Sequence, residues 1–211
     1  WLRHFHIQAK GALYNAIDLD EIQRRLAHPV RNFREEYGIP DQADVITFTG
    51  RLLAEKGLLP LVQAFKKVRS QYPDTYLCIA GDGDLEEELK KQSDSHILLL
   101  GRLDSGEIVD LLGNSDIFCL PSVSEGFSTS LLEAAACKNY IVVTDSACPR
   151  ELLPDDRYAR ILPELTEGSI QEGLLWALSH PRERQEAAAR AYERLASHFT
   201  WKIVTDRIQK I

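Results

Sequence analysis

The sequence has 211 residues, of which 44% are hydrophobic and 27% are charged, with a formal net charge of −7 and no methionine. This composition excludes a disordered, collagen-like or disulfide-stabilised chain. The acidic balance disfavours a general nucleic-acid binder, and no apolar run approaches the roughly 18 residues of a membrane-spanning helix. Since residue 1 is Trp and no Met occurs, we expect a fragment of a longer protein.

The cysteines indicate a reducing environment. None of the four forms a C-x-x-C pair, which disfavours a zinc site and thioredoxin-type chemistry. Cys78 and Cys119 lie inside apolar runs and are predicted to be buried thiols. Because free thiols persist in reducing compartments, we expect a cytoplasmic protein.

The first 37 residues are predicted to contain a short strand near Ala12–Tyr14, followed by two short helices. Asp18 and Asp20 form a D-x-D pattern directly before Glu21. Because Asp is a preferred helix N-cap, we interpret both as caps of the first helix rather than as metal ligands.

Six short apolar runs rich in β-branched residues predict parallel strands. None of them alternates apolar with polar residues, which is the pattern of strands buried on both faces. Helical patterns lie between the runs, so we expect right-handed β-α-β units and a doubly wound, Rossmann-like α/β fold. The predicted strands are Val45–Thr49, Thr75–Ala80, Ile97–Leu100, Asp116–Leu120, Tyr140–Thr144 and Tyr158–Leu162.

Three helices are expected between these strands. The first covers Leu58–Val68, where apolar residues recur at i, i+3, i+4 and i+7. The second contains Ile108 and is expected to take Ser105 as its N-cap. The third covers Leu131–Ala136.

The chain changes character after Leu162, where only helices are predicted: Ser169–Ser179, Pro181–Ser197 and Thr200–Ile211. No linker divides the sequence. We therefore expect a single domain over residues 1–211, with an α/β core at about 12–162 and an all-helical tail at 163–211.

The segment that follows the first strong strand, Gly50–Gly57, carries Arg51 and Lys56 next to a helix start. Glycine at position 50 allows a ligand to approach the backbone closely. Helix N-termini favour anions, and Arg adds a bidentate fork for phosphate oxygens. The alternative interpretation is a solvated turn with two surface cations.

A second candidate segment follows the fourth strong strand. Glu125 falls in the loop, and Glu133 falls about one turn into the next helix. The residues between them supply free backbone N–H groups for a phosphate, while carboxylates accept pairs of hydroxyls. The alternative is that Glu133 stabilises the helix dipole and Glu125 is simply exposed.

Together these segments resemble the C-terminal, donor-binding lobe of GT-B fold glycosyltransferases, in particular glycosyltransferase family 4. The resemblance covers roughly residues 12–211, and its specificity lies in the order of motifs that are weak singly. The two glutamates match the E-x₇-E pattern of the family. The matching segments are Tyr14-Asn15-Ala16-Ile17-Asp18, Gly50-Arg51-Leu52, Lys56-Gly57, Ala80-Gly81-Asp82-Gly83, Leu100-Gly101-Arg102-Leu103, Ser115-Asp116, Leu120-Pro121-Ser122, Glu125-Gly126-Phe127 and Glu133-Ala134.

The resemblance implies a role for each matching position. Arg51 and Lys56 would bind the donor diphosphate and, with Glu125, form the catalytic set. Glu125 would bind hydroxyls of the donor sugar, and Glu133 would hold the ribose hydroxyls. The loop at Arg102-Leu103 would cradle the base. The backbone would meet sugar and phosphate at Gly50, Gly126, Phe127, Ser128, Thr129, Ser130 and Leu131.

The implied reaction transfers a sugar from a nucleoside-diphosphate sugar to an acceptor hydroxyl with retention of configuration. Because Arg51 and Lys56 would stabilise the leaving group, we expect no metal and no further cofactor. A UDP-sugar is favoured over a GDP-sugar. A second D-x-D pattern, Asp82-Gly83-Asp84, is interpreted as a turn before Leu85 rather than as a metal site.

The expected partners follow from the same resemblance. A glycan or lipid-linked acceptor would bind through an N-terminal domain that this chain lacks, so the fragment is expected to be inactive alone. Surface polysaccharide or lipopolysaccharide synthesis at the inner face of a bacterial membrane is the expected setting, with peripheral membrane association of the full-length enzyme and no nucleic-acid partner.

Three departures from the family pattern bear on the acceptor-side loop and on the identity of the sugar. Ala16 stands where Gly is usual, Lys138-Asn139 replaces a turn that commonly contains Gly, and a common pair of glycines is missing before Ser146–Glu151.

Two alternative functions are compared with sugar transfer. A non-catalytic nucleotide-binding module of the same fold would share the pocket, but it would be free to lose the charged pairs. A dinucleotide-dependent oxidoreductase needs G-x-G-x-x-G after a strand, and Gly81-Asp82-Gly83 is followed by Asp84-Leu85-Glu86, so the third glycine is absent.

Overall fold

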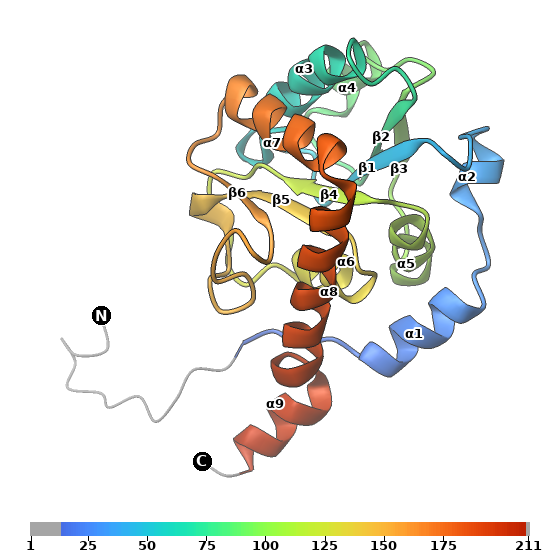
Figure 1. The fold of residues 1–211 in the computed structure, drawn as a ribbon. Helices are drawn as coiled ribbons and strands as arrows, with labels where there is room; N and C mark the ends of the chain where they lie inside the picture. Colours follow the sequence, from blue (N-terminus) through green and yellow to red (C-terminus); the bar gives the residue numbers. More distant parts are fainter. Residues whose placement is uncertain (1–13, 210–211) are drawn as a thin grey trace.

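The structure, a computed structural model, describes residues 14–209, in which six strands form one parallel sheet (Figure 1). The strand order is β3-β2-β1-β4-β5-β6, and every neighbouring pair is parallel. This confirms the doubly wound, Rossmann-like sheet. The strands are β1 Asp44–Thr49, β2 Thr75–Ala80, β3 Ile97–Gly101, β4 Ile117–Leu120, β5 Tyr140–Thr144 and β6 Arg160–Leu162.

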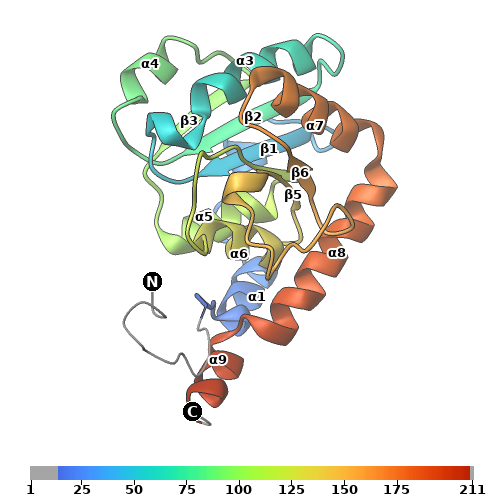
Figure 2. The same ribbon diagram turned by 90° about the vertical axis from the view of Figure 1, so that its left-hand side faces the viewer.

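Helices cover both faces of the sheet (Figures 1 and 2). On one face, α3 (Leu58–Arg69) packs against α7 (Glu167–Ser179). On the other face lie α5 (Ser105–Gly113) and α6 (Thr129–Ala136), and α1 (Leu19–Ala27) packs against both of them. The sheet is therefore the middle layer of three.

Apolar side chains from both helix layers fill the space against the sheet. The spacing predicted for α3 is confirmed, because its apolar residues are fully buried: Leu58, Leu61, Val62, Phe65 and Val68. The predicted thiols Cys78 and Cys119 are also buried, and burial raises the pKa of Cys78 to about 12. Such thiols are inert packing groups rather than nucleophiles.

No strand follows Leu162 within the described part of the chain, as the sequence predicts. Helix α8 (Pro181–His198) packs along α6 and β5, and α9 (Trp201–Ile208) follows it. The tail is tied back to the head of the chain at Ile17, whose N–H donates to the Phe199 carbonyl at 3.1 Å and whose carbonyl accepts from Trp201 N at 3.0 Å. Residues distant in sequence thus meet beside α6.

The predicted cap of α5 is wrong by one residue. Asp104, not Ser105, is the N-cap: its carboxylate accepts the Glu107 N–H at 2.8 Å, and the Glu107 carboxylate accepts the Asp104 N–H at 2.9 Å. This reciprocal pair is a capping box, which satisfies two backbone donors instead of the one that Ser105 would reach.

Other boundaries differ from the sequence prediction. Of the strand predicted at Ala12–Tyr14, the first two residues lie outside the described range, and Tyr14 is not in a strand. Strand β6 begins at Arg160 instead of Tyr158. Helix α2 (Phe33–Glu36) is the second of the two short helices predicted in the head. Helix α4 (Glu86–Lys90) is not predicted from the sequence. Within residues 14–209, no helix combines the length and apolar character needed to cross a bilayer.

Candidate functional site

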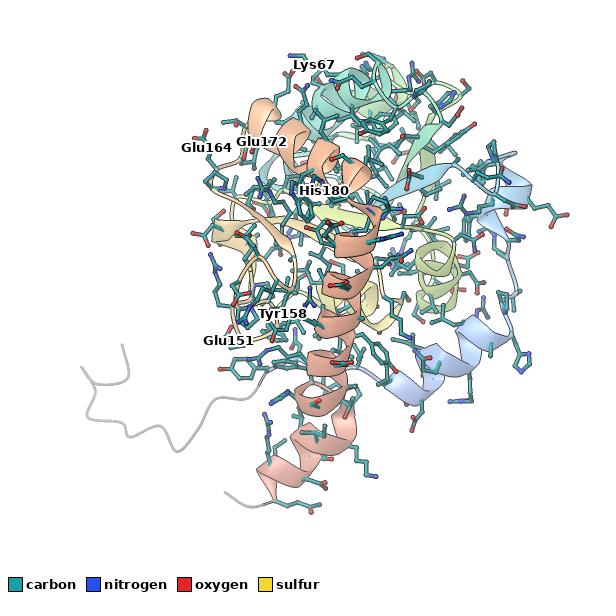
Figure 3. The ribbon with its side chains drawn as sticks, in the orientation of Figure 1. Lys67, Glu151, Tyr158, Glu164, Glu172 and His180 are labelled. Atoms are coloured by element: carbon teal, nitrogen blue, oxygen red, sulfur yellow. The ribbon has the colours of Figure 1, made fainter. Side chains whose placement is uncertain are left out.

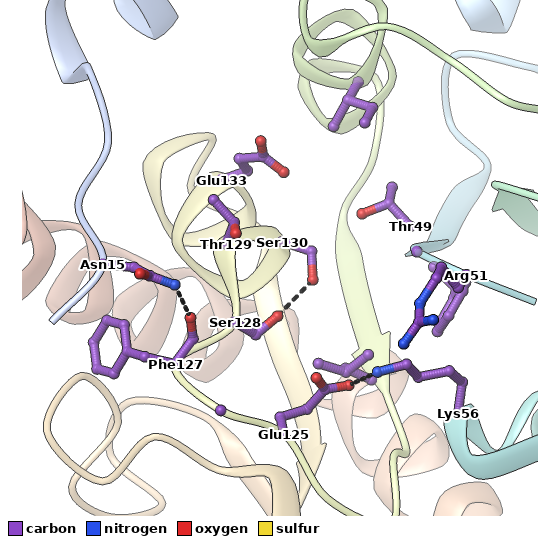
Figure 4. Close-up of a pocket in the computed structure, with 15 residues that line it drawn as sticks. Asn15, Thr49, Arg51, Lys56, Glu125, Phe127, Ser128, Thr129, Ser130 and Glu133 are labelled. Carbon is purple, nitrogen blue, oxygen red and sulfur yellow. Dashed lines mark hydrogen bonds and ion pairs between the residues drawn. The ribbon is translucent and has the colours of Figure 1, made fainter. Parts of the chain in front are cut away.

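The candidate site lies where the strand order reverses. Strands β1 and β4 are neighbours, yet β1 leads into α3 on one face and β4 leads into α6 on the other. Ligands of open α/β sheets bind in the crevice that such a switch creates at the carboxyl ends of the strands. A pocket of about 500 Å³ opens there (Figure 4), lined by Asn15, Phe48, Thr49, Gly50, Arg51, Lys56, Ile108, Leu120, Glu125, Gly126, Phe127, Ser128, Thr129, Ser130 and Glu133.

Backbone hydrogen bonds fix the loop after β1. The Gly50 N–H donates to the Ala80 carbonyl at 3.0 Å, and the Leu52 N–H donates to the Asp82 carbonyl at 2.7 Å. Arg51 lies between these two anchors, and its side chain is 71% exposed, with Glu55 3.9 Å away. The backbone is therefore held while the guanidinium stays free to meet an anion.

The loops after β1 and β4 are joined to each other. The Val123 N–H donates to the Glu55 carbonyl at 2.8 Å, and the Ser122 hydroxyl donates to the same oxygen at 3.1 Å. On the pocket side of this junction, Lys56 Nζ lies 2.6 Å from Glu125 Oε1, with only 13% and 14% of the two side chains exposed (Figure 4). A cation and a carboxylate from different loops thus neutralise each other inside the pocket.

The N-terminus of α6 forms the floor of the site. Its N-cap Ser128 makes no side-chain hydrogen bond to the helix backbone; its hydroxyl lies 2.8 Å from the Ser130 hydroxyl instead. The first N–H groups of the helix are thus left uncapped by this side chain, and the helix dipole adds positive potential at the same place. This end of α6 is suited to an anion.

Residues from both ends of the chain hold the loop before α6. Asn15 Nδ2 donates to the Phe127 carbonyl at 2.5 Å. The Phe127 ring packs against Tyr14 and Phe199, with centroids 5.1 and 5.0 Å away. The sequence resemblance includes Asn15 in a motif but gives it no role, and this hydrogen bond assigns it a positioning one.

Glu133 lies one turn into α6, where burial raises the pKa of its carboxyl to about 7. Among residues 14–209, no cation lies within ion-pair distance of it. It lines the pocket together with Thr129, and the same two residues border a second cavity of about 610 Å³ next to α1. A half-buried carboxylate that lines two cavities and has no ion-pair partner in the described residues is suited to accept hydrogen bonds from ligand hydroxyls.

Three of the residues that the resemblance implies do not line the pocket. The Arg102 side chain is 83% exposed and lies 3.9 Å from Asp82. Leu103 packs against the smaller apolar cluster around Phe33 and Val45. Leu131 is fully buried in the core and does not line the pocket.

The pocket is also lined by residues to which the sequence motifs assign no role in the site: Phe48, Thr49, Ile108 and Leu120. Thr49 and Leu120 are the last residues of β1 and β4, so the rule that ligands bind at strand ends would have pointed to them. Phe48 and Ile108 carry no comparable signal, since their apolar side chains are indistinguishable in sequence from core residues.

The aspartates of the two D-x-D patterns lie at a helix start and in a turn. The Asp18 carboxylate accepts the Glu21 N–H at 2.9 Å and caps α1, whereas Asp20 lies in the first turn of that helix. Asp82 and Asp84 lie in the turn before α4. Within the described range, no three His, Cys, Asp or Glu side chains are grouped as metal ligands.

The switch-point pocket of this doubly wound sheet brings together two cations, two carboxylates and a helix N-terminus, an arrangement suited to an anionic ligand that carries hydroxyl groups. The family model described as Glycosyl transferases group 1 matches residues 29–194 of this chain. The chain belongs to that family.

Among curated relatives, the phosphatidyl-myo-inositol mannosyltransferase of Mycobacterium tuberculosis is 29% identical over 185 residues, which covers 82% of this chain and 48% of the relative. The chain therefore spans about half the length of that relative.

Solved structures show the same fold. Anabaena Alr3699/HepE in complex with UDP matches with a TM-score of 0.83 at 16% identity, over 99% of this chain and 59% of that one. The C-terminal domain of a glycosyl transferase group 1 family protein (LpcC) from Francisella tularensis matches with a TM-score of 0.72 at 23% identity, over 88% and 99% of the two chains. The fold is that of the C-terminal lobe of GT-B glycosyltransferases.

Proposed function

We propose that this chain is the donor-binding lobe of a retaining glycosyltransferase of family 4 type, which transfers a sugar from a nucleoside-diphosphate sugar to an acceptor hydroxyl. The observation that carries the proposal is the Lys56–Glu125 pair, enclosed in the switch-point pocket beside the uncapped N-terminus of α6. Membership in the glycosyl transferases group 1 family supports it.

The diphosphate of the donor fits the cationic side of the pocket. Arg51 provides an exposed guanidinium, Lys56 an enclosed ammonium, and α6 its first N–H groups. When the sugar leaves, negative charge develops on the nucleoside diphosphate, and groups fixed in advance stabilise it. Removing one such contact raises a barrier by about 2.7–4 kcal/mol. On this proposal the protein's own cations do this work, and no metal takes part.

The two glutamates accept hydrogen bonds from hydroxyl groups of the donor. Glu125 neutralises Lys56 in the structure; on this proposal a bound phosphate takes over that ion pair and frees Glu125 to accept hydrogen bonds from the donor sugar. Glu133, one turn into α6 and without a cationic partner in the described structure, accepts hydrogen bonds from the ribose. We propose a UDP-sugar rather than a GDP-sugar as the donor, and the binding of UDP by the Anabaena neighbour supports this preference.

The proposed class of acceptor is argued from the relatives of this chain. The name of the mycobacterial relative specifies a phosphatidyl-inositol acceptor, which supports a lipid-linked or glycan acceptor for this protein. We place the full-length enzyme in bacterial surface polysaccharide or lipopolysaccharide synthesis, in the cytoplasm and at the inner face of the membrane. The 211-residue chain is expected to bind nucleotide without transferring sugar; robust turnover by it alone would contradict this part.

Titration calorimetry on the chain with UDP, GDP, UMP and uridine tests the proposal. Wild type should bind a nucleoside diphosphate, and Lys56→Ala should weaken UDP at least about tenfold while changing uridine binding little. The matched control is Lys67→Ala. That residue projects from the outer side of α3 (Figure 3) and pairs with Glu167 at 2.6 Å. Absence of binding by any nucleotide would overturn the proposed function.

A further inference from the structure

One hydroxyl in the pocket has no partner. Thr49 is only 3% exposed, and its buried Oγ1 makes no hydrogen bond within the described residues. Thr47, two residues earlier on the same face of β1, shows the usual arrangement: its hydroxyl lies 2.6 Å from the Ser115 hydroxyl. Both threonines lie on the same face of β1, and of the two only the hydroxyl at the strand end is unpaired.

An unpaired buried hydroxyl is destabilising, because it loses its hydrogen bonds to water and gains none. Valine has the same shape as threonine, fits the same strand position and avoids that penalty. Apolar side chains are accepted in this pocket, since Ile108 and Leu120 also line it. Folding alone therefore gives no reason for the hydroxyl.

The position of the side chain suggests a partner outside the protein. Thr49 is the last residue of β1 and lines the pocket at the switch point. Its hydroxyl points into the space between β1 and α6, toward the side that carries Ser130 and Glu133 (Figure 4). A hydroxyl both donates and accepts, so it can pair with a ligand hydroxyl or with a phosphate oxygen.

We propose that Thr49 is a ligand-contacting residue whose hydroxyl hydrogen-bonds an oxygen atom of the bound nucleoside diphosphate. The inference rests on the proposed function and adds to it a residue that neither the sequence motifs nor the charged groups indicate. The bound nucleotide then satisfies a polar atom that the free protein leaves unpaired.

The variant Thr49→Val gives a two-part signature. Without ligand, it should raise the Tm by about 2–4 °C, because the unpaired hydroxyl is gone. In calorimetry, it should weaken UDP binding about tenfold, because a ligand oxygen loses its partner. Thr49→Ser keeps the hydroxyl and should retain binding within about twofold.

Thr47→Val is the matched control. It breaks the hydrogen bond to Ser115, so it should lower the Tm and leave the Kd for UDP unchanged. Comparison of UDP with uridine identifies the contacted group: a loss for both points to the ribose, and a loss for UDP alone points to the phosphates.

Two results would overturn the inference separately from the proposed function. If wild type binds UDP and Thr49→Val binds it equally well, the hydroxyl does not contact the nucleotide. If Thr49→Val lowers the Tm of the free protein, the hydroxyl already has a partner within the fold. If wild type binds no nucleotide at all, the proposed function fails and this inference fails with it.

Discussion

Lys56 Nζ and Glu125 Oε1 lie 2.6 Å apart across the two loops that form the pocket. The residues are 69 positions apart in sequence, and the contact exists because the Glu55 carbonyl accepts hydrogen bonds from Ser122 and Val123 next to it. The charge of Lys56 is thus neutralised by Glu125. On the proposed function, a phosphate of the donor displaces the Glu125 carboxylate when it pairs with Lys56.

The first prediction follows from that competition. Glu125→Gln preserves the shape of the side chain but removes its charge, so Lys56 becomes an enclosed cation without a counter-charge. UDP should then bind about three- to tenfold more tightly in calorimetry, although sugar transfer by the full-length enzyme should fall. The control Glu55→Gln alters an exposed pair 3.9 Å from Arg51, where the effect on UDP should be below about twofold. Weaker UDP binding by Glu125→Gln would contradict the prediction.

The second prediction concerns Glu133 and pH. Burial raises the pKa of its carboxyl from 4.5 to about 7, so the folded state binds more protons than the unfolded state between these values. Stability should therefore fall as pH rises from about 4.5 to 7, with a loss of about 2 kcal/mol from this group after allowance for its partial exposure.

Urea denaturation of Glu133→Gln at pH 5 and pH 8 checks this sign. The variant should lose this part of the pH dependence and be more stable than wild type at pH 8. Glu88→Gln, an exposed change on α4, is the control and should leave the profile as it is. Asp155, whose pKa is lowered to about 2 by Arg157, affects stability only in more acidic solution and does not overlap with this window. An unchanged profile in Glu133→Gln would count against the carboxylate as its source.

The strands were predictable from sequence because burial on both faces leaves runs of apolar, β-branched residues that few other structures produce. Helix α4 was not, because its five residues, Glu86–Lys90, are charged at all positions but one and show no apolar period. The cap of α5 was misplaced for a similar reason: Ser105 and Asp104 are both good caps, and only the reciprocal bond with Glu107 distinguishes them.

The charged residues of the site were predictable from spacing, but their relationship was not. Arg51, Lys56, Glu125 and Glu133 all line the pocket, whereas the ion pair between two of them depends on how two loops meet. The position of Arg102 outside the pocket likewise depends on loop conformation, which no local pattern determines.

The third prediction concerns Lys138, at the turn where the resemblance leads one to expect glycine. Its φ of 60° lies in the left-handed region, and its ammonium lies 4.7 Å from the centroid of the Tyr192 ring. Lys138→Gly and Lys138→Ala both remove the cation–π contact, but only glycine relieves the backbone. The glycine variant should therefore be more stable than the alanine variant by about 1 kcal/mol in urea denaturation. Equal stability of the two would show that the turn carries no such strain.

The last prediction concerns Gly57, which connects Lys56 to α3. Its φ is +68°, and a Cβ added there would lie 2.1 Å from the Pro121 carbonyl oxygen, at the start of the loop that holds Glu125. Gly38 has a φ of +64° but no atom within 4 Å of such a Cβ, so Gly38→Ala measures the backbone penalty alone. The free energy of unfolding of Gly57→Ala should be lower than that of Gly38→Ala by about 1–3 kcal/mol, because the Pro121 loop must move.

That movement should separate Glu125 from Lys56, so Gly57→Ala should also change the Kd for UDP, while Gly38→Ala should keep the wild-type value. Denaturation and calorimetry on the same two proteins test both consequences. Equal stability of the two variants would mean that the loop gives way without cost. A lower stability of Gly57→Ala with unchanged UDP binding would mean that the Pro121 loop packs against Gly57 without positioning the carboxylate, and the coupling between the two loops would then be structural only.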